Sequence, residues 1–365
     1  VSISTKENNL KDIITLAKIY KNTPQIYIFN KMVKEGVVIA DIVLNFDDKG
    51  KLRNSYDIKG SISKGKIRLF NKKNINNISF DFNINDKKYL IEDGQIEYEK
   101  LKLSSKKINI NDTGKFFLIE GNLSSSKSLI NSELLKTIFK NNLANIDINN
   151  INLGSENNFS FRLGKKFKIS KYKIDSKIDL QKLTYKKKSN SLKKIIPNYK
   201  DSVELIDHKI ELFFSKNKLL INGNGNFLID KKTDKINYSI QSSGDKNNFK
   251  SQIGLNNIPL QIKLFNYSKE ENKNALLNIE GFYKKNKNIY FKNISLKESE
   301  NNFKINGLSL NKNYKINYIE ETILDFLNDN KKKNKILLKK IKNNYKLSGK
   351  IFDGTNLLDE ILKSD

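Results

Sequence analysis

The 365-residue chain has no cysteine, no tryptophan and a single histidine, His208. The lack of cysteine excludes disulfides, thiolate chemistry and zinc clusters built on cysteine. One histidine rules out multi-histidine metal sites and histidine-based triads. We interpret His208, which stands just before Ile210, as a structural residue at the start of a strand. We therefore expect no catalytic residues, no cofactor and no metal.

Arginine is almost absent from a strongly basic chain. The formal net charge is +28, yet only Arg53, Arg68 and Arg162 are arginines among 68 basic residues. Arginine is the residue that most often reads bases and grips phosphates in pairs of hydrogen bonds. The lysines lie along the polar side of nearly every segment, as a biased genome composition would produce. We expect no nucleic-acid partner, and attraction to anionic lipid headgroups stays open.

Three short motifs suggest chemistry, but each departs from its pattern. Gly223-Asn224-Gly225 begins like a dinucleotide fingerprint, but Leu228 stands where the third glycine belongs. Asp47-Asp48-Lys49-Gly50 has lysine where a calcium ligand should stand, so a hairpin turn is expected. The acidic pair Glu97 and Glu99 lies among lysines, which favours cross-strand ion pairs over glycosidase chemistry.

Long apolar segments are missing as well. No window of about 20 apolar residues occurs that could cross a bilayer as a helix. The chain shows no secretory signal and opens with Val1 rather than methionine. We expect it to be a piece of a longer protein.

The dominant pattern in the sequence is the alternation of apolar and polar residues. In Ile78–Ile84, four apolar side chains point to one side and Ser79, Asp81 and Asn83 to the other. The same period recurs at Leu101–Leu103, Ile108–Ile110, Phe159–Leu163, Phe167–Ile169, Ile236–Ile240, Leu260–Leu264, Ile289–Phe291, Ile294–Leu296, Phe303–Ile305, Leu308–Leu310 and Tyr314–Tyr318. Turn clusters such as Ser243–Lys246 and Lys284–Lys287 separate these runs. Spacing of roughly 8–12 residues predicts an antiparallel meander.

A short glycine motif accompanies the strands. An aliphatic residue, one polar residue and a glycine occur together at Ile58–Gly60, Ile119–Gly121, Ile221–Gly223, Ile279–Gly281, Ile305–Gly307 and Leu347–Gly349. Glycine inside a strand is typical of a bulge or bend where a wide sheet curls. Ordinary turn glycines are the alternative.

Helical periodicity is confined to short segments. Residues 10–20 carry apolar side chains at helical spacing, and Pro24 is expected to close that segment. A second helix is expected around Leu134–Phe139 and a third at Leu357–Ile361. Residues 319–327 fit helix or strand equally, and the basic run Lys331–Lys335 reads as a solvated loop. We divide the chain into a helix and first β segment (1–125), a helical insertion (126–145) and a further β segment (146–365).

These few helices cannot cover the apolar face of so many strands. Burial of apolar surface is worth roughly 25 cal/mol per Å², so leaving such a face exposed to water is unfavourable. A second sheet, closure into a barrel or bound acyl chains could cover it, and lysine-rich strands fit a membrane barrel poorly. We therefore predict a mainly β protein, a long antiparallel sheet curled into an elongated groove with a few short amphipathic helices. The candidate acyl-chain contacts are Phe80, Phe82, Phe161, Ile262 and Phe291.

The pattern as a whole resembles the AsmA-like superfamily of bacterial envelope proteins, nearest the YhdP-type branch. Three stretches carry the resemblance: the helix at 10–20 followed by Met32–Leu44; Gly60–Ile67 with Ile78–Ile84 and Gly94–Tyr98; and Ile289–Leu296 with Phe303–Leu310 and Leu347–Gly354. It implies a periplasmic protein anchored to the inner membrane, whose groove carries phospholipid between the two bacterial membranes. It also implies that the anchor helix and the family's C-terminal portion are absent from this chain.

Two rival functions remain beside this one. The first is a self-closed β-sandwich with a surface or adhesin-like structural role. The second is a basic module that binds nucleic acid. The lipid class, the direction of transport and protein partners are not specified by the sequence.

Overall fold

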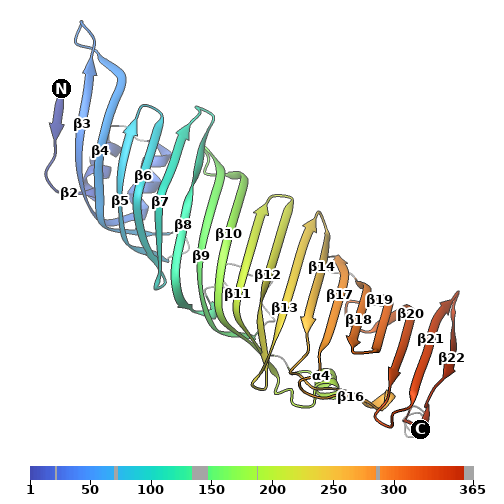
Figure 1. Ribbon diagram of the computed structural model, residues 1–365. Coiled ribbons are helices and arrows are strands. Elements are labelled where there is room, and N and C mark those ends of the chain that lie inside the picture. The colour runs from blue at the N-terminus through green and yellow to red at the C-terminus, as the bar shows by residue number, and fades with distance from the viewer. Residues whose placement is uncertain (21–22, 70–72, 134–146, 187, 285–287, 357–365) are drawn as a thin grey trace. The chain divides into compact units, whose positions relative to one another are not determined.

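The computed structural model describes residues 1–20, 23–69, 73–133, 147–186, 188–284 and 288–356. Within these ranges the protein is mainly β, with 20 strands in one antiparallel sheet and two more, β15 and β16, paired with each other (Figure 1). Consecutive strands are joined as a meander, as the spacing of the apolar runs predicts. The expected fold class, mainly β with an antiparallel sheet and few helices, is confirmed.

The chain forms two compact units, whose boundary runs through strands β8, β9 and β10. Unit 1 contains residues 1–128 and 154–177, and unit 2 contains 129–153 and 178–365. Of the helical insertion expected at 126–145, Ser126–Ile130 continue strand β8, and 134–146 lie outside the described residues. The helix expected at Leu357–Ile361 also lies outside them.

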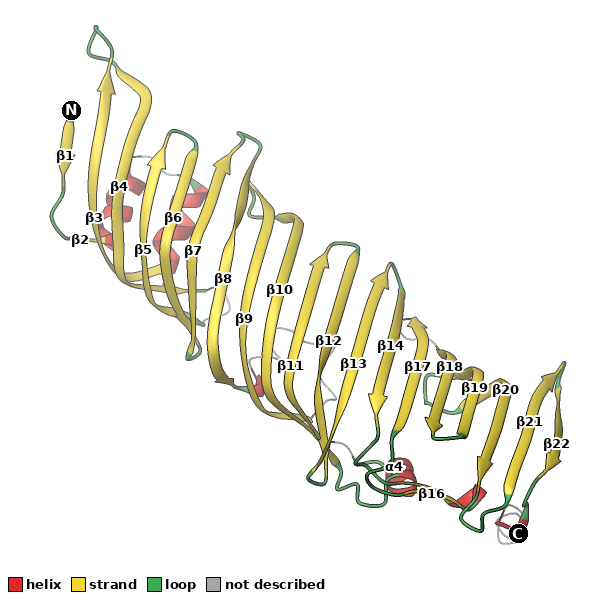
Figure 2. Ribbon diagram, viewed as in Figure 1, coloured by secondary structure: helices red, strands yellow, loops and turns green. Residues whose placement is uncertain are grey.

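Unit 1 begins with two helices and continues as a run of hairpins. The helices are α1 (Leu10–Tyr20) and α2 (Pro24–Met32). The strands are β1 (Ser2–Ser4), β2 (Asn8–Asn9), β3 (Val33–Phe46), β4 (Leu52–Arg68), β5 (Asn74–Asn85), β6 (Lys88–Tyr98), β7 (Leu101–Asp112) and β8 (Phe116–Ile130), with parts of β9 (Asp147–Gly164) and β10 (Ile169–Lys186). Figure 2 shows both helices beside the first strands of this unit.

Helix α1 is confirmed with the bounds that its apolar spacing predicts, and it ends before Pro24. A second helix, α2, begins at Pro24 and is missed by the sequence patterns. Proline suits the first turn of a helix because its missing N–H would have no intrahelical partner there. The Thr23 hydroxyl caps this helix by accepting a hydrogen bond from the Ile26 backbone N–H at 3.3 Å.

The expected hairpin at Asp47–Gly50 joins β3 to β4. The Asp47 carboxylate accepts backbone N–H bonds from Lys49 at 3.0 Å and Lys51 at 2.8 Å. Its oxygens therefore stabilise the turn itself, as aspartate does in such loops.

Unit 2 continues the meander and adds an insertion between β14 and β17. Its strands are β11 (Ser202–Ser215), β12 (Lys218–Ile229), β13 (Lys232–Ser243), β14 (Lys246–Gly254), β15 (Leu260–Ile262), β16 (Tyr267–Lys269), β17 (Ala275–Lys284), β18 (Ile289–Glu298), β19 (Asn301–Leu310), β20 (Ile316–Leu327), β21 (Lys333–Ile341) and β22 (Asn344–Ile351). Helix α4 (Asn190–Ile195) and the 3₁₀ turn η2 (Lys263–Phe265) complete the described elements.

Several expected boundaries in unit 2 need correction. Residues 319–327, undecided between helix and strand, belong to strand β20. The run Lys331–Lys335 is only partly loop, because β21 starts at Lys333 and Lys333 forms an ion pair with Asp325 at 2.7 Å. The strand expected at Leu260–Leu264 stops at Ile262, where η2 begins. Phe167 in unit 1 and Tyr314 in unit 2 lie in turns with positive φ, outside the strands expected there.

Three of the six recurring glycines face an aromatic side chain on the neighbouring strand. Gly60 is directly opposite Phe82, Gly223 is opposite Tyr238, and Gly281 is opposite Phe249. A Cβ atom at Gly281 would lie 2.8 Å from the Phe249 ring, closer than packed atoms allow. These three glycines make room for an aromatic ring against the sheet. The bulges that the sequence predicts occur next to Gly281 and Gly349.

Candidate functional site

An apolar face extends across the strands of unit 1. Directly paired residues in an antiparallel sheet share a face, and two such rows are almost wholly apolar. The first joins Ile42, Ile58, Ile84, Tyr89, Ile110 and Ile119; the second joins Ala40, Gly60, Phe82, Ile91, Ile108 and Gly121. The residues between the two rows, Asp41, Lys59, Asn83, Leu90, Asn109 and Glu120, point to the opposite face and are polar except Leu90.

This face is only half-buried. All members of the two rows remain partly accessible to solvent. Among the described hydrophobic residues of unit 1, only Val33 and Ile78 are fully buried, and both adjoin the helices. A sheet packed against a second sheet would bury such a row completely. The apolar rows of unit 1 therefore lack a protein cover of that kind in the described part of the chain.

Helices α1 and α2 cover one end of the face incompletely. Between Leu10 and Ile14 of α1, Phe29 of α2 and the strands lies an apolar cavity of about 190 Å³, lined also by Phe80. The Phe80 ring meets the Phe82 ring edge-on, with centroids 6.4 Å apart. Two of the candidate residues from the sequence are thus neighbours on the apolar face, one of them beneath the helices.

Phe161, the third candidate, lies on β9 in unit 1. Its ring is 6.0 Å from that of Phe159, measured between centroids, and the side chain is half-buried. Like the residues of the two apolar rows, Phe161 is apolar and only partly accessible to solvent.

The sheet of unit 2 also has an apolar face, but part of it is covered. One row of directly paired residues contains Ile236, Ile253, Leu277, Leu296, Phe303, Leu324 and Ile336. Residues 255–274, which we call the flap, fold back over this row: Leu255, Ile258, Leu260 and Tyr267 join Phe303, Leu324 and Phe326 in a buried cluster. The Tyr267 and Phe303 rings lie 4.6 Å apart, and Phe326 has no exposed surface.

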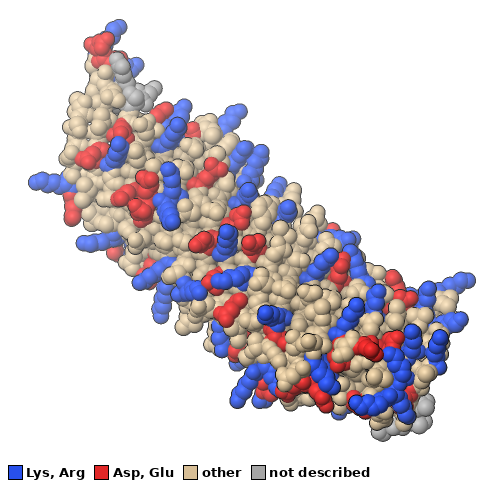
Figure 3. Space-filling view, viewed as in Figure 1, with Lys and Arg blue, Asp and Glu red and all other residues tan. Residues whose placement is uncertain are grey.

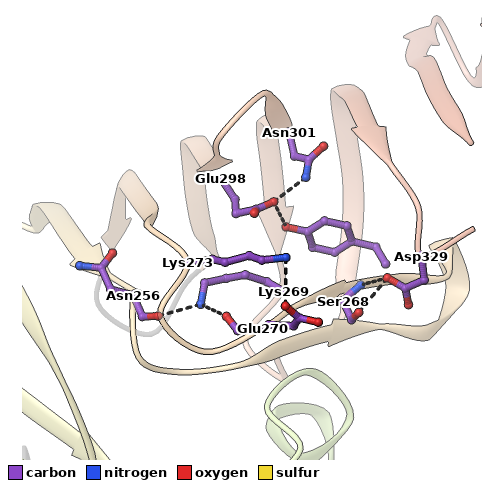
Figure 4. Close-up of polar contacts among 9 residues, drawn as sticks. Asn256, Ser268, Lys269, Glu270, Lys273, Glu298, Asn301 and Asp329 are labelled. Atoms are coloured by element: carbon purple, nitrogen blue, oxygen red, sulfur yellow. Dashed lines mark hydrogen bonds and ion pairs between the residues drawn. The ribbon is translucent and has the colours of Figure 1, made fainter. Parts of the chain in front are cut away.

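Buried polar contacts hold the flap together internally through Lys269 and tie it to the sheet through Tyr267 (Figure 4). Lys269, which is 1% exposed, donates from Nζ to the backbone carbonyls of Asn256, Ile258 and Glu270 at 3.1, 3.0 and 2.8 Å. Burial lowers the pKa of the Lys269 ammonium. The Tyr267 hydroxyl donates to Glu298 at 3.1 Å, and burial is the main reason that its pKa is raised.

A second anchor holds the start of the flap. The Asp234 carboxylate accepts the backbone N–H groups of Asn256, Asn257 and Ile258 at 3.0, 2.9 and 3.1 Å. Because an unmet buried N–H is costly, these bonds fix where the chain leaves β14. The flap is thus part of the folded core of unit 2.

The remaining two candidates fall on different parts of unit 2. Phe291 lies on the sheet, with its ring 5.6 Å from that of Phe249. It belongs to a half-exposed row that also contains Leu212, Ile221, Ile240, Phe249, Gly281, Leu308 and Ile319. Ile262 lies in β15 of the flap and packs on the buried cluster. Its placement on a strand of the long sheet, as the alternation predicts, is therefore wrong.

Side chains on this face are more exposed at the strand ends away from the flap than at the strand ends beneath it. On β20, Phe326 and Leu324 are 0% and 6% exposed, whereas Ile316 at the other end is 61% exposed. On β17, Ala275 is 5% and Tyr283 is 38% exposed. In unit 2 the apolar face is closed at the flap and open at the opposite ends of its strands.

His208 is fully buried and bonded within the sheet, which fits a structural role, but it lies in the middle of β11, so its placement at the start of a strand is wrong. Nε2 lies 2.9 Å from the Asn226 carbonyl oxygen and Nδ1 lies 3.2 Å from the Tyr238 hydroxyl. Since a carbonyl only accepts, Nε2 carries the proton and Nδ1 accepts from the tyrosine. Burial lowers the pKa of the His208 imidazole.

The described residues contain no cluster of three or more histidine, cysteine, aspartate or glutamate side chains suited to a metal ion. Among them, too, no helix combines the length and apolarity that crossing a membrane requires. No family model, no curated protein and no solved structure matches the chain.

Proposed function

We propose that this protein binds lipid acyl chains along the apolar face of its sheet and supports phospholipid transport between the inner and outer membranes. In this proposal it is a non-enzymatic periplasmic segment of an AsmA/YhdP-like protein, anchored to the inner membrane by a region outside this chain. Phospholipid and bacterial membranes are its partners, and the apolar face forms the floor of the groove.

The half-exposed rows of unit 1 carry the proposal. Ile84, Tyr89 and Ile110 are paired across successive strands, and each keeps solvent-accessible surface. Exposed apolar patches above a few hundred Å² are rare on monomeric proteins and mark sites that bind something apolar. Acyl chains suit a face that continues across successive strands, because they are themselves long and apolar.

The polar residues on the opposite face of the sheet fit the outer, water-facing side of a groove. Asp41, Lys59, Asn109 and Glu120 are exposed there, so the two sides of the sheet differ sharply in polarity. A self-closed sandwich would need a second sheet over the apolar side, and the other sheet among the described residues has two strands and lies in unit 2.

The experiment is mass spectrometry of lipids extracted from the purified chain, combined with displacement of a fluorescent fatty-acid analogue. Ile110→Asn, on the apolar face, should lower the affinity for the analogue about tenfold, because a buried amide contacts the tail. Leu118→Asn is the matched control, since Leu118 pairs with Asn111 on the opposite face.

Three outcomes oppose the proposal. Equal loss in both variants would assign the effect to folding, which urea unfolding of each variant tests separately. Protein free of lipid that also ignores the analogue would favour the self-closed structural role. Binding of DNA with a steep dependence on salt, without lipid binding, would favour the nucleic-acid module.

A further inference from the structure

The two ends of the strands in unit 2 differ in charge. The hairpins 216–217, 244–245 and 342–343, the loop 311–315 and Lys284 lie at one end of the strands, which we call the tip edge. The flap and the turns at 230–231, 299–300 and 328–332 lie at the other end.

The tip edge carries seven lysines and one carboxylate. Counting the described loop residues and one neighbour on each side, the lysines are Lys216, Lys218, Lys246, Lys284, Lys312, Lys315 and Lys342, and the carboxylate is Asp245. Figure 3 shows basic side chains projecting along the edge where Figure 1 draws the β11–β12 and β13–β14 hairpins. None of the seven forms an ion pair with a carboxylate in the described part of the chain.

The flap end is neutralised by contrast. Lys200 pairs with Asp230 at 2.5 Å, and Lys273 pairs with Glu270 at 3.1 Å. Lys332 pairs with Asp353 at 3.2 Å. Carboxylates therefore offset part of the lysine charge at the flap end, whereas the seven lysines of the tip edge have a single carboxylate, Asp245, among them.

Some tip lysines are held in place without losing charge. The Lys246 ammonium lies 4.2 Å from the centroid of the Phe282 ring, and Lys218 lies 5.5 Å from that of Phe213, both on the face opposite the apolar row. A cation–π contact orients an ammonium group and leaves its hydrogen-bond donors available to an anion. Neighbouring hairpins stand about 10 Å apart, twice the spacing of adjacent strands.

Immediately inside these lysines lies exposed apolar surface. Tyr283, Ile289, Leu310 and Ile316 form a paired row next to the tip loops. An amphiphile with an anionic head fits this arrangement, because its tail can contact the apolar row while its head contacts the ammonium groups. Nucleic acid fits less well, because unit 2 contains no arginine.

We propose that the tip edge of unit 2 binds the phosphate headgroup of anionic phospholipids, whose acyl tails lie on the apolar face and point toward the flap. This inference rests on the proposed function and adds the headgroup class and the orientation of the bound lipid. The flap closes the far end, so tails enter from the tip edge only.

The test offers the chain equal amounts of phosphatidylglycerol and phosphatidylcholine in mixed vesicles, separates it from them and measures the retained lipid by mass spectrometry. The tip variant combines Lys216→Gln, Lys312→Gln, Lys315→Gln and Lys342→Gln, which all lie in exposed loops of this edge. The control variant removes the same charge from the polar face through Lys235→Gln, Lys297→Gln, Lys304→Gln and Lys339→Gln.

The unaltered chain and the control should retain phosphatidylglycerol in excess, by about fivefold for each lysine that contacts a headgroup. The tip variant should retain the two lipids in equal amounts. An excess that survives in the tip variant, or disappears equally in the control, would overturn the headgroup assignment while lipid binding stands. Retention of no lipid by any form would overturn the proposed function as well.

Discussion

The Tyr238 ring lies flat over Gly223 of the adjacent strand, where a Cβ atom would be 2.3 Å from the ring carbon Cζ. The same ring bears the hydroxyl that bonds the buried His208, and Gly225 makes room for the His208 ring in the same way. Comparable pairs at Gly60 and Gly281 show that this arrangement is repeated in both units.

Gly223→Ala should destabilise the protein by about 1–3 kcal/mol, because the added methyl group displaces the Tyr238 ring from its packed position. Urea unfolding measures the change. Gly254→Ala is the control, since the nearest atom to its added Cβ lies at an ordinary 3.5 Å. Equal destabilisation by both substitutions would show that loss of glycine in a strand, and not the aromatic contact, is responsible.

The buried His208 should make stability depend on pH near neutrality. Its folded-state pKa is lowered from 6.5, so the unfolded chain binds the proton more readily. The stabilisation is complete above the unfolded pKa and is lost as pH falls through it toward the folded value. Urea midpoints of the wild type should therefore drop between pH about 7.5 and about 5.5.

In His208→Gln, the decrease over the same pH range should be smaller, because glutamine does not titrate. A decrease of the same size in the variant would assign the pH dependence to other groups. Protonation of Asp353 does not contribute in this pH range. Its carboxylate accepts hydrogen bonds from Thr355 and Lys332, which hold its pKa at about 2, so it is protonated only at lower pH.

Lys269→Met should loosen the flap. Three backbone carbonyls lose their common donor, at a cost of about 1–3 kcal/mol. Hydrogen exchange of residues 255–274 should accelerate while the strands of unit 1 keep their rates. Lys263→Met, on an exposed position of the same flap, should leave exchange unchanged. Equal rates in the two variants would show that Lys269 does not fasten the flap.

The strands were predictable because their signal is local. Alternation at Ile78–Ile84 specifies both a strand and its apolar side, whatever lies elsewhere in the chain. Phe80, Phe82 and Phe161 were found this way, each half-buried on the sheet. Whether their face is covered depends on distant segments, which periodicity does not report.

The flap shows where local reasoning fails. Leu260–Leu264 alternates like the other strands, yet this segment leaves the sheet. The remote Asp234 binds the backbone N–H of Ile258 just before it, and Leu260 joins Tyr267 and Phe303 in the buried cluster. Phe167 and Tyr314 also fit the alternation but lie in turns with φ of 55° and 61°. The charge difference between the two ends of unit 2 likewise emerges only when the hairpins are aligned.

Photo-crosslinking at two neighbouring residues tests the central claim most directly. Ile91 lies on the apolar face opposite Phe82, and Leu90 lies on the polar face opposite Asn83; both are aliphatic and half-buried. With a photoreactive leucine analogue at each position in turn and native membranes present, the account predicts crosslinks to lipid from position 91 and none from position 90. Crosslinks to lipid at equal yield from both positions, or from neither, would contradict it.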